Sequence, residues 1–139
     1  GLCKRELERL REEKENALYF VDEIMYRYVW RGWPIVSRAK KEIDMVRKGE
    51  IKIERFGGKR NIRILDSGIG IYPFFMAKIN RDSEIFAYES AKHDYEIASS
   101  TAGCPKNLHF IHAVTEDEMN CYDGLPVEFD VTLVNPLSL

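Results

Sequence analysis

Two short apolar runs in the sequence each end in residues that could bind a nucleoside. The run at 62–65 is followed at 66–70 by DSGIG, and the run at 84–88 is followed by Glu89. Two glycines let a ligand approach the backbone closely, and a helix beginning near Pro73 would offer unbonded N–H groups. An acidic residue at the end of the next strand can accept hydrogen bonds from ribose hydroxyls. The pattern predicts a nucleoside-binding site.

The charge of this loop bears on which nucleoside it would take. A dinucleotide fingerprint requires G-x-G-x-x-G, and Pro73 stands where its third glycine would be. Asp66, ahead of the glycines, is unexpected beside a pyrophosphate but suits a nucleoside that carries a cationic amine and a sulfonium. An NAD-dependent enzyme is an alternative interpretation, and Pro73 speaks against it.

A parallel sheet would bring these residues to one edge, and the pattern from residue 61 onward predicts such a sheet. Strands are expected at 62–65, 84–88, 108–112 and 129–134, with helices at 73–79 and 93–102. This alternation is typical of βαβ units and predicts an α/β, doubly wound parallel sheet. Ligands of such sheets bind outside the carboxyl ends of the strands. The residues at 113–117 and 135–137 are therefore expected at the same edge.

The first part of the chain has a different pattern. Residues 1 to about 48 predict a helical hairpin, broken at Gly32 and Pro34, and 51–56 alternate as a short strand or extended linker does. The expected division is a hairpin with its linker at 1–56 and a sheet domain at 57–139. The inward-facing hairpin residues are expected to be Leu7, Leu10, Leu18, Val21, Ile24, Met25, Tyr28, Ile35, Val36, Ala39, Ile43 and Val46.

The stretch 64–70, together with Glu89, resembles class I S-adenosylmethionine (SAM)-dependent methyltransferases over about residues 61–139. The resemblance implies that the loop wraps the methionine part of SAM and that Glu89 holds the ribose. It also implies adenine contacts after the third strand, with Asn135 and Pro136 facing the reaction centre. The cofactor-binding residues that it implies are Asp66, Ser67, Gly68, Gly70, Tyr72, Glu89, Val114, Thr115 and Asn135.

The chain departs from the family pattern at three points. Tyr72 replaces the usual third glycine, and Asn135-Pro136-Leu137-Ser138 only half matches the Asn-Pro-Pro-aromatic motif of amino-methylating members. Four strands are expected where the family sheet has seven. Three explanations stay open: a fragment, a half-sheet that completes itself by oligomerising, or a degenerate relative. The N-terminal helices fit the lid that many members carry.

The function implied by the resemblance is methyl transfer from SAM to an unidentified acceptor. No general base is evident, and Asn135 is the candidate positioning group at the reaction centre. A non-catalytic assembly module is the rival from another class. The spacing Gly68-x-Gly70-x-x-Pro73 also resembles nicotianamine-synthase-type enzymes, which implies aminocarboxypropyl transfer from the same cofactor as a further alternative.

Composition limits the remaining classes of protein. The chain has 139 residues, of which 45% are hydrophobic, and it lacks an apolar run of transmembrane length. A net charge of −2 argues against a strongly basic nucleic-acid binder. One basic-biased stretch, from Arg38 to Arg60, is interrupted by acids and predicts a solvated face, with nucleic acid as the minority interpretation. The interrupting acids are Glu42, Asp44, Glu50 and Glu54.

Cysteine and histidine patterns predict neither disulfides nor a metal site. Cys3, Cys104 and Cys121 are widely spaced, which favours free thiols and, with no leader sequence evident, a cytoplasmic location. His109 and His112 are an odd number of positions apart on one strand, so they should point to opposite faces. Trp33, beside Pro34, is the candidate lid contact.

Overall fold

The structure is a computed structural model, and it describes most of the chain with short gaps. The described residues are 3–28, 33–67, 71–100, 104–114, 117–118 and 128–136. Some residues named in the sequence analysis lie outside these ranges: Gly32, Gly68, Gly70, Thr115, Cys121, Leu137 and Ser138. The side chains of Tyr28, Trp33, Pro34, Ile35 and Val36 are not described either. In the described part of the chain, no helix is both long enough and apolar enough to span a membrane.

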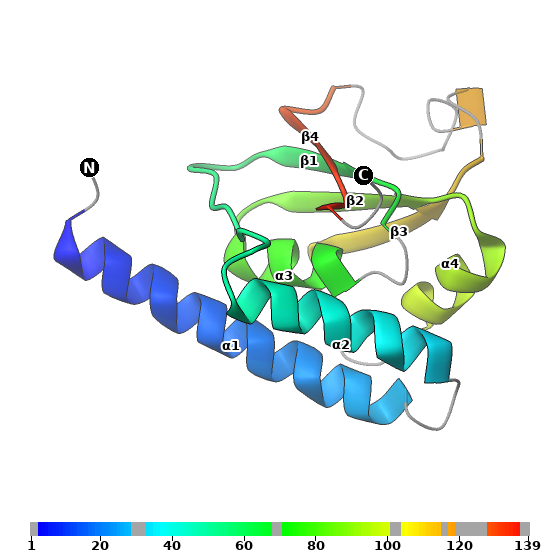
Figure 1. Ribbon diagram of the computed structural model, residues 1–139. Helices are drawn as coiled ribbons and strands as arrows, with labels where there is room; N and C mark the ends of the chain where they lie inside the picture. The colour runs from blue at the N-terminus through cyan, green and yellow to red at the C-terminus, as the bar shows by residue number, and fades with distance from the viewer. Residues whose placement is uncertain are drawn as a thin grey trace.

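Helices and strands follow one another largely as the sequence pattern predicts (Figure 1). The 51–56 segment contains no strand and runs as irregular backbone, so of the two expectations the linker is the one confirmed. In chain order the elements are α1 (Lys4–Tyr28), α2 (Trp33–Arg47), β1 (Asn61–Leu65), α3 (Ile71–Ile79), β2 (Glu84–Glu89), α4 (Lys92–Ser99), β3 (Leu108–His112) and β4 (Val131–Val134).

The four strands form one sheet in the order β3-β2-β1-β4, and every neighbouring pair is parallel. These are the first four positions of the doubly wound strand order 3-2-1-4-5-6. The order reverses direction at β1, which has β2 on one side and β4 on the other. The α/β, doubly wound fold class is therefore confirmed, and β1 marks its switch point.

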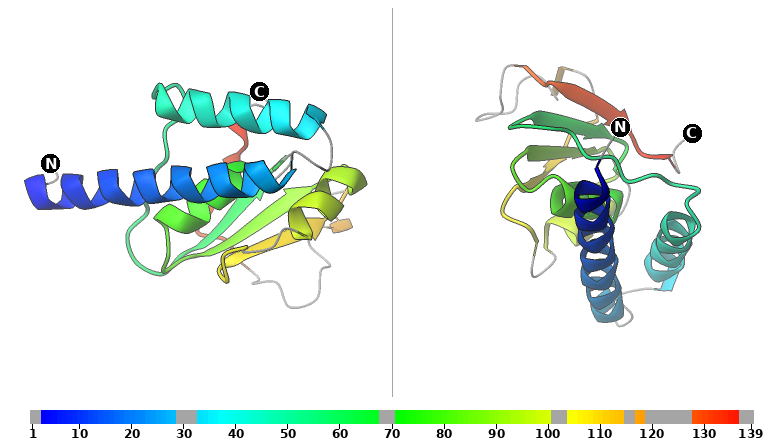
Figure 2. Two further views of the ribbon diagram at one scale, coloured as in Figure 1. Left: turned by 90° about the horizontal axis from the view of Figure 1, so that it is seen from below. Right: turned by 90° about the vertical axis from the view of Figure 1, so that its left-hand side faces the viewer.

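Helices α1 to α4 lie on one face of the sheet (Figures 1 and 2). Helix α3 packs directly on the strands and is buried along almost its whole length, and α1 packs across α3. Phe74 of α3 lies edge-on between two rings, with centroid distances of 5.9 Å to Phe20 and 5.7 Å to Phe110. Hairpin and sheet thus bury their apolar side chains in one shared core.

Several boundaries and one exposure differ from the sequence-based expectation. Strands β1 and β2 are each one residue longer than expected, and α4 ends at Ser99 rather than 102. Helix α3 begins at Ile71 rather than Pro73, because proline is tolerated in the first turn, where its N–H would have no partner. Strand β4 begins at Val131 rather than 129. Leu7 was expected inside but is 52% exposed, because the amino end of α1 projects beyond the sheet (Figure 2).

Candidate functional site

The carboxyl ends of β1, β2 and β4 bring three buried polar side chains together. The backbone N–H of Ser67 donates to the carbonyl oxygen of Tyr88 at 3.1 Å, and its Oγ lies 3.5 Å from Oε2 of Glu89. Nδ2 of Asn135 donates to the carbonyl oxygen of Ser67 at 3.0 Å. Ser67, Glu89 and Asn135 are each at most 5% exposed. One hydrogen-bonded network therefore joins three strand ends at the switch point.

Glu89, the last residue of β2, is held in place by the backbone around it. Its Oε1 accepts a hydrogen bond of 2.9 Å from the N–H of Ala91, and its carbonyl oxygen accepts one of 3.1 Å from Ala113. The bond from Ala91 orients the carboxylate of Glu89 at the end of β2.

Asp66 follows β1 in the left-handed region of backbone conformation, with φ of 52°. This conformation is unfavourable for residues other than glycine, although Asp tolerates it better than most. Backbone strain of this kind often accompanies a functional site. The exposed Asp66 borders a pocket of about 250 Å³. The other lining residues are Leu65, Tyr88, Ser90, Ala113 and Val114.

Of the described residues that were predicted for the site, Asp66 and Val114 line this pocket, whereas Ser67, Tyr72, Glu89 and Asn135 do not. Tyr72 lies in the first turn of α3 and is 5% exposed. Val114 is 62% exposed, and its N–H donates to Oε2 of Glu118 at 3.0 Å. Asn135 does not line the pocket, since its amide holds the Ser67 carbonyl, and Pro136 beside it is half-buried. Tyr88 and Ser90 were not singled out from the sequence, although their place at the end of β2 could have indicated them.

Glu42 on α2 was expected on a solvated face, and that expectation is wrong because the residue is 1% exposed. Burial raises its pKa from 4.5 to about 7, against the attraction of Arg38 and a hydrogen bond from the backbone of Tyr72. The pKa of Tyr72 is raised to about 12, by burial first and then by the charges of Glu54 and Glu42. Helical spacing could have found Glu42, because it stands three residues after Ala39 and four before Val46, which are both buried.

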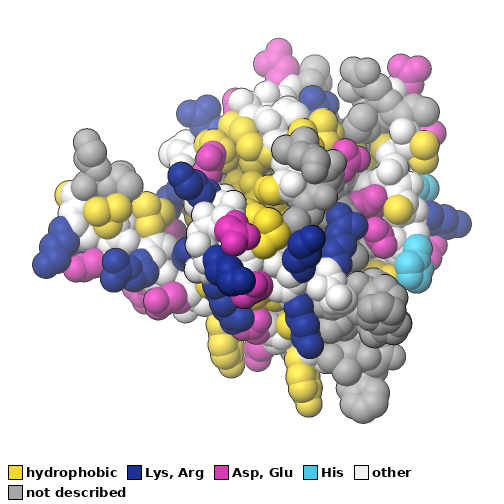
Figure 3. Space-filling view, viewed as in Figure 1, with side chains coloured by type: hydrophobic (Ala, Val, Ile, Leu, Met, Phe, Trp, Pro, Cys, Tyr) yellow, Lys and Arg dark blue, Asp and Glu magenta, His cyan; other side chains and the backbone are white. Residues whose placement is uncertain are grey.

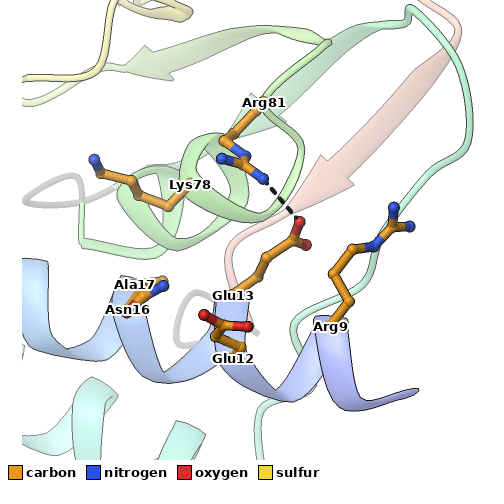
Figure 4. A pocket seen from close by; sticks show the side chains of 7 residues that line it. All are labelled: Arg9, Glu12, Glu13, Asn16, Ala17, Lys78 and Arg81. Atoms are coloured by element: carbon orange, nitrogen blue, oxygen red, sulfur yellow. Dashed lines mark hydrogen bonds and ion pairs between the residues drawn. The ribbon is translucent and has the colours of Figure 1, made fainter. Parts of the chain in front are cut away.

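A larger pocket, of about 350 Å³, lies away from the strand ends, between α1 and the far end of α3 (Figure 4). Glu13 lies at its centre, 7% exposed, and pairs with Arg55 and, at 3.2 Å, with Arg81. The charged pattern of residues 4–15 would place Glu13 on a solvated face of the helix, and its burial shows that this interpretation is wrong. Its cationic partners stand 42 and 68 positions later in the chain, so helical periodicity could not have predicted these contacts. We interpret this cluster as an ionic contact that docks α1.

By contrast, the projecting end of α1 carries Lys and Arg side chains mixed with Asp and Glu (Figure 3), as a solvated face does. Within the basic-biased stretch, Asp44, Glu50 and Glu54 are exposed, as expected. The solvated-face interpretation therefore holds for these three acids, and Glu42 is the exception among the four.

The histidines have structural partners on different sides of β3. His109 stacks on Phe86 and lies 2.6 Å from Glu84, whereas His112 stacks on Tyr95 of α4. Within the described ranges, no group of three or more His, Cys, Asp or Glu side chains could hold a metal ion.

Comparison with known proteins adds two solved structures. No protein-family model and no curated protein matches the chain. One of the two solved structures is plantazolicin methyltransferase BpumL in complex with a monoazolic desmethylPZN analog and SAH. The match has a TM-score of 0.41 and 15% sequence identity, and it covers 96% of this chain and 50% of the BpumL chain. The other is BpumL in complex with SAH. The match has a TM-score of 0.41 and 16% sequence identity, and it covers 92% of this chain and 49% of the BpumL chain. The chain spans about half the length of these methyltransferases.

Proposed function

We propose that this chain binds SAM at the carboxyl edge of its sheet and forms the cofactor-binding part of a methyltransferase. The observation that carries the proposal is the buried network of Ser67, Glu89 and Asn135, which joins three strand ends beside the strained Asp66. Doubly wound sheets bind their ligands in this crevice, where the strand order reverses.

The chemistry of the residues fits the parts of SAM. The carboxylate of Glu89, oriented at the strand end, suits the two ribose hydroxyls, and the exposed carboxylate of Asp66 suits a cationic amino acid moiety. Leu65, Tyr88 and Ala113 give the pocket an apolar lining that suits adenine. When bound, SAM supplies an electrophilic methyl carbon, and the chain's own residues bind and orient it.

Asn135 serves in this proposal as a positioning residue. Its side chain is fully buried and holds the Ser67 carbonyl, so it fixes the backbone from which Asp66 projects. A role for Asn135 at the reacting atoms stays a prediction, and the methyl acceptor is left unspecified.

Self-association and a cytoplasmic location are further parts of the proposal. Among the described strands, β4 pairs only with β1, and Thr132 and Val134 on it are exposed, so this edge could pair with another copy. Cys3 and Cys104 are free thiols, which supports a reducing compartment.

Isothermal titration calorimetry with SAM and SAH tests the binding. Asp66→Asn and Glu89→Gln should each weaken SAM binding about tenfold or more, equivalent to about 1.4 kcal/mol. Asp82→Asn is the matched control, because it changes an exposed acid outside the strand-end site and should leave affinity unchanged. The absence of binding heat with SAM, or tighter binding of NAD than of SAM, would contradict the proposal.

The product of turnover separates the two transfer reactions. Methyl transfer releases SAH, whereas aminocarboxypropyl transfer releases 5′-methylthioadenosine, and chromatography distinguishes the two nucleosides. SAM binding without either product, across a broad panel of acceptors, would favour the non-catalytic module.

A further inference from the structure

Glu42 is a buried acidic residue, and packing alone does not explain why an acid stands at this position. Its side chain is 1% exposed, and its Oε1 is buried without a hydrogen-bond partner among the described residues. A buried carboxylate is costly unless it is paired and hydrogen-bonded, and native structures contain few such atoms. An unpartnered buried oxygen of this kind therefore points to a ligand that the described residues do not include.

Glu42 contacts the first turn of α3, the helix that follows the strand-end loop after β1. A hydrogen bond from the backbone of Tyr72 joins Glu42 to the first turn of α3. That turn contains no acidic residue of its own, although a helix N-terminus favours a nearby negative charge. Helix α2 thus supplies an acid to the start of α3, which begins at Ile71, four residues after Ser67.

The charged groups around Glu42 leave it without a strong cationic partner. Arg38, on α2 itself, attracts it but does not offset burial. From α3 the titratable neighbour is Tyr72, and beyond Tyr72 lies Glu54 from the segment after α2, which is itself acidic. In the described residues, these are the groups that shift the two pKa values.

We propose that Glu42 is a binding residue whose Oε1 accepts a hydrogen bond from the ammonium group of the cofactor, which gives helix α2 a direct role in recognising the amino acid end of SAM. This inference rests on the proposed function and extends it, because the strand-end site contains no residue from the hairpin. The rival interpretation is that Glu42 only docks α2 onto α3.

The two interpretations differ in their proton balance. With a pKa of about 7, about half of the Glu42 side chains carry a proton at pH 7 in the ligand-free protein. An ammonium group beside the carboxyl favours its charged form, so binding expels that proton to solvent. Binding at pH 7 should therefore release up to about half a proton per ligand, and SAM affinity should rise between pH 6 and pH 7, below the range in which an α-ammonium group itself loses its proton. A purely structural contact would release none.

Calorimetry at pH 7 in two buffers of different ionisation enthalpy measures this release on the wild-type chain. SAM and SAH, which both carry the ammonium group, should release the same fraction of a proton. The probe 5′-methylthioadenosine, which lacks the amino acid moiety, should release none. Equal release with 5′-methylthioadenosine, or release with SAM but not with SAH, would overturn the assignment to the ammonium group.

Glu42→Gln is the direct variant, and Asp44→Asn on the same helix is its matched control. Glu42→Gln should lose the proton release and bind SAM about tenfold more weakly at pH 8, whereas the exposed Asp44→Asn should change neither. SAM binding by Glu42→Gln with unchanged affinity and unchanged proton release would overturn the inference. If Glu42→Gln does not fold, the ligand series on the wild type decides. A wild-type chain that binds no SAM removes the proposed function, and the inference with it.

Discussion

Two acidic residues near the start of α3, Glu42 on α2 and Asp66 after β1, are held in states that cost stability. Glu42 is held in a place where its charge is unfavourable, and Asp66 is held in a backbone conformation that few residues adopt. Both features lower the stability of the ligand-free chain and are retained beside the same predicted ligand. Each can be measured separately from binding.

The burial of Glu42 makes stability depend on pH in a direction opposite to that of most carboxylates. Its pKa is about 7 in the folded chain and near the ordinary 4.5 in the unfolded chain, so the folded chain binds more protons between these values. The contribution is therefore fully present below pH 4.5 and is lost as pH rises through 7. The difference corresponds to about 3 kcal/mol in the free energy of unfolding.

Urea denaturation at pH 5 and pH 8 checks this prediction on the wild type and Glu42→Gln. The variant should gain stability relative to the wild type at pH 8 by about 1–3 kcal/mol, because the buried charge is removed. At pH 5 the two should be nearly equal. Identical pH dependence of the two proteins would contradict a buried, titrating Glu42.

Two substitutions of Asp66 test whether its left-handed backbone conformation lowers the stability of the folded chain. Asp66→Gly and Asp66→Ala both remove the carboxylate, but only glycine adopts a φ of 52° without steric cost. Asp66→Ala should therefore be less stable than Asp66→Gly by about 1 kcal/mol, as measured by urea denaturation. Equal stability would mean that the backbone relaxes at this position. Both variants should bind SAM more weakly, since neither retains the acid.

At the scale of the elements, an ionic contact holds α1 against the rest of the fold. Glu13 is almost fully buried between Arg55 and Arg81, whereas Glu12 beside it is exposed. Glu13→Ala should lower the free energy of unfolding by about 1–3 kcal/mol, because it breaks a buried, hydrogen-bonded charge network. Glu12→Ala should stay within about 0.5 kcal/mol of the wild type. Urea denaturation measures both, and similar effects of the two changes would argue against a docking role.

The elements themselves were largely predictable from sequence because their signals are local. Alternating or continuous apolar runs identified all four strands, and Gly32 with Pro34 indicated where the hairpin breaks. The burial of Glu13 was not predictable in the same way, and the helical spacing that puts Glu42 on the inward side of α2 does not reveal its contact. The partners of Glu13 are distant in the chain, and the contact of Glu42 with Tyr72 exists only after α2 has docked on α3.

The candidate site was predictable in position but not in its internal contacts. The rule that ligands bind at the carboxyl ends of parallel strands placed Asp66, Glu89 and Asn135 at one edge. The Asn135 amide donates to the carbonyl of Ser67, 68 residues away in the chain. This contact depends on the register of β4 against β1. Spacing along the chain contains no information on that register.

At the scale of the whole molecule, hairpin and sheet share one hydrophobic core. Fully or nearly fully buried residues of α1, α2, α3 and the strands belong to the same cluster, including Ala17, Ile24, Ile43, Ile64 and Phe74. Without the sheet, the amphipathic hairpin would expose its apolar face to water. Without the hairpin, α3 would lose the cover that α1 provides. The predicted boundary near residue 56 therefore separates two patterns of sequence across a continuous core.

This continuity predicts that the chain unfolds in a single cooperative transition. Both tryptophans, Trp30 and Trp33, belong to the hairpin sequence, so their fluorescence reports on the hairpin, whereas far-ultraviolet circular dichroism reports on all helices and strands. Their midpoints in urea should coincide, as they do for two-state domains. Saturating SAM, at about 100 times its Kd, should shift both midpoints together by an amount equivalent to about 2.7 kcal/mol. A fluorescence transition that precedes the circular dichroism transition, or that SAM leaves unmoved, would show instead that the hairpin unfolds independently of the sheet.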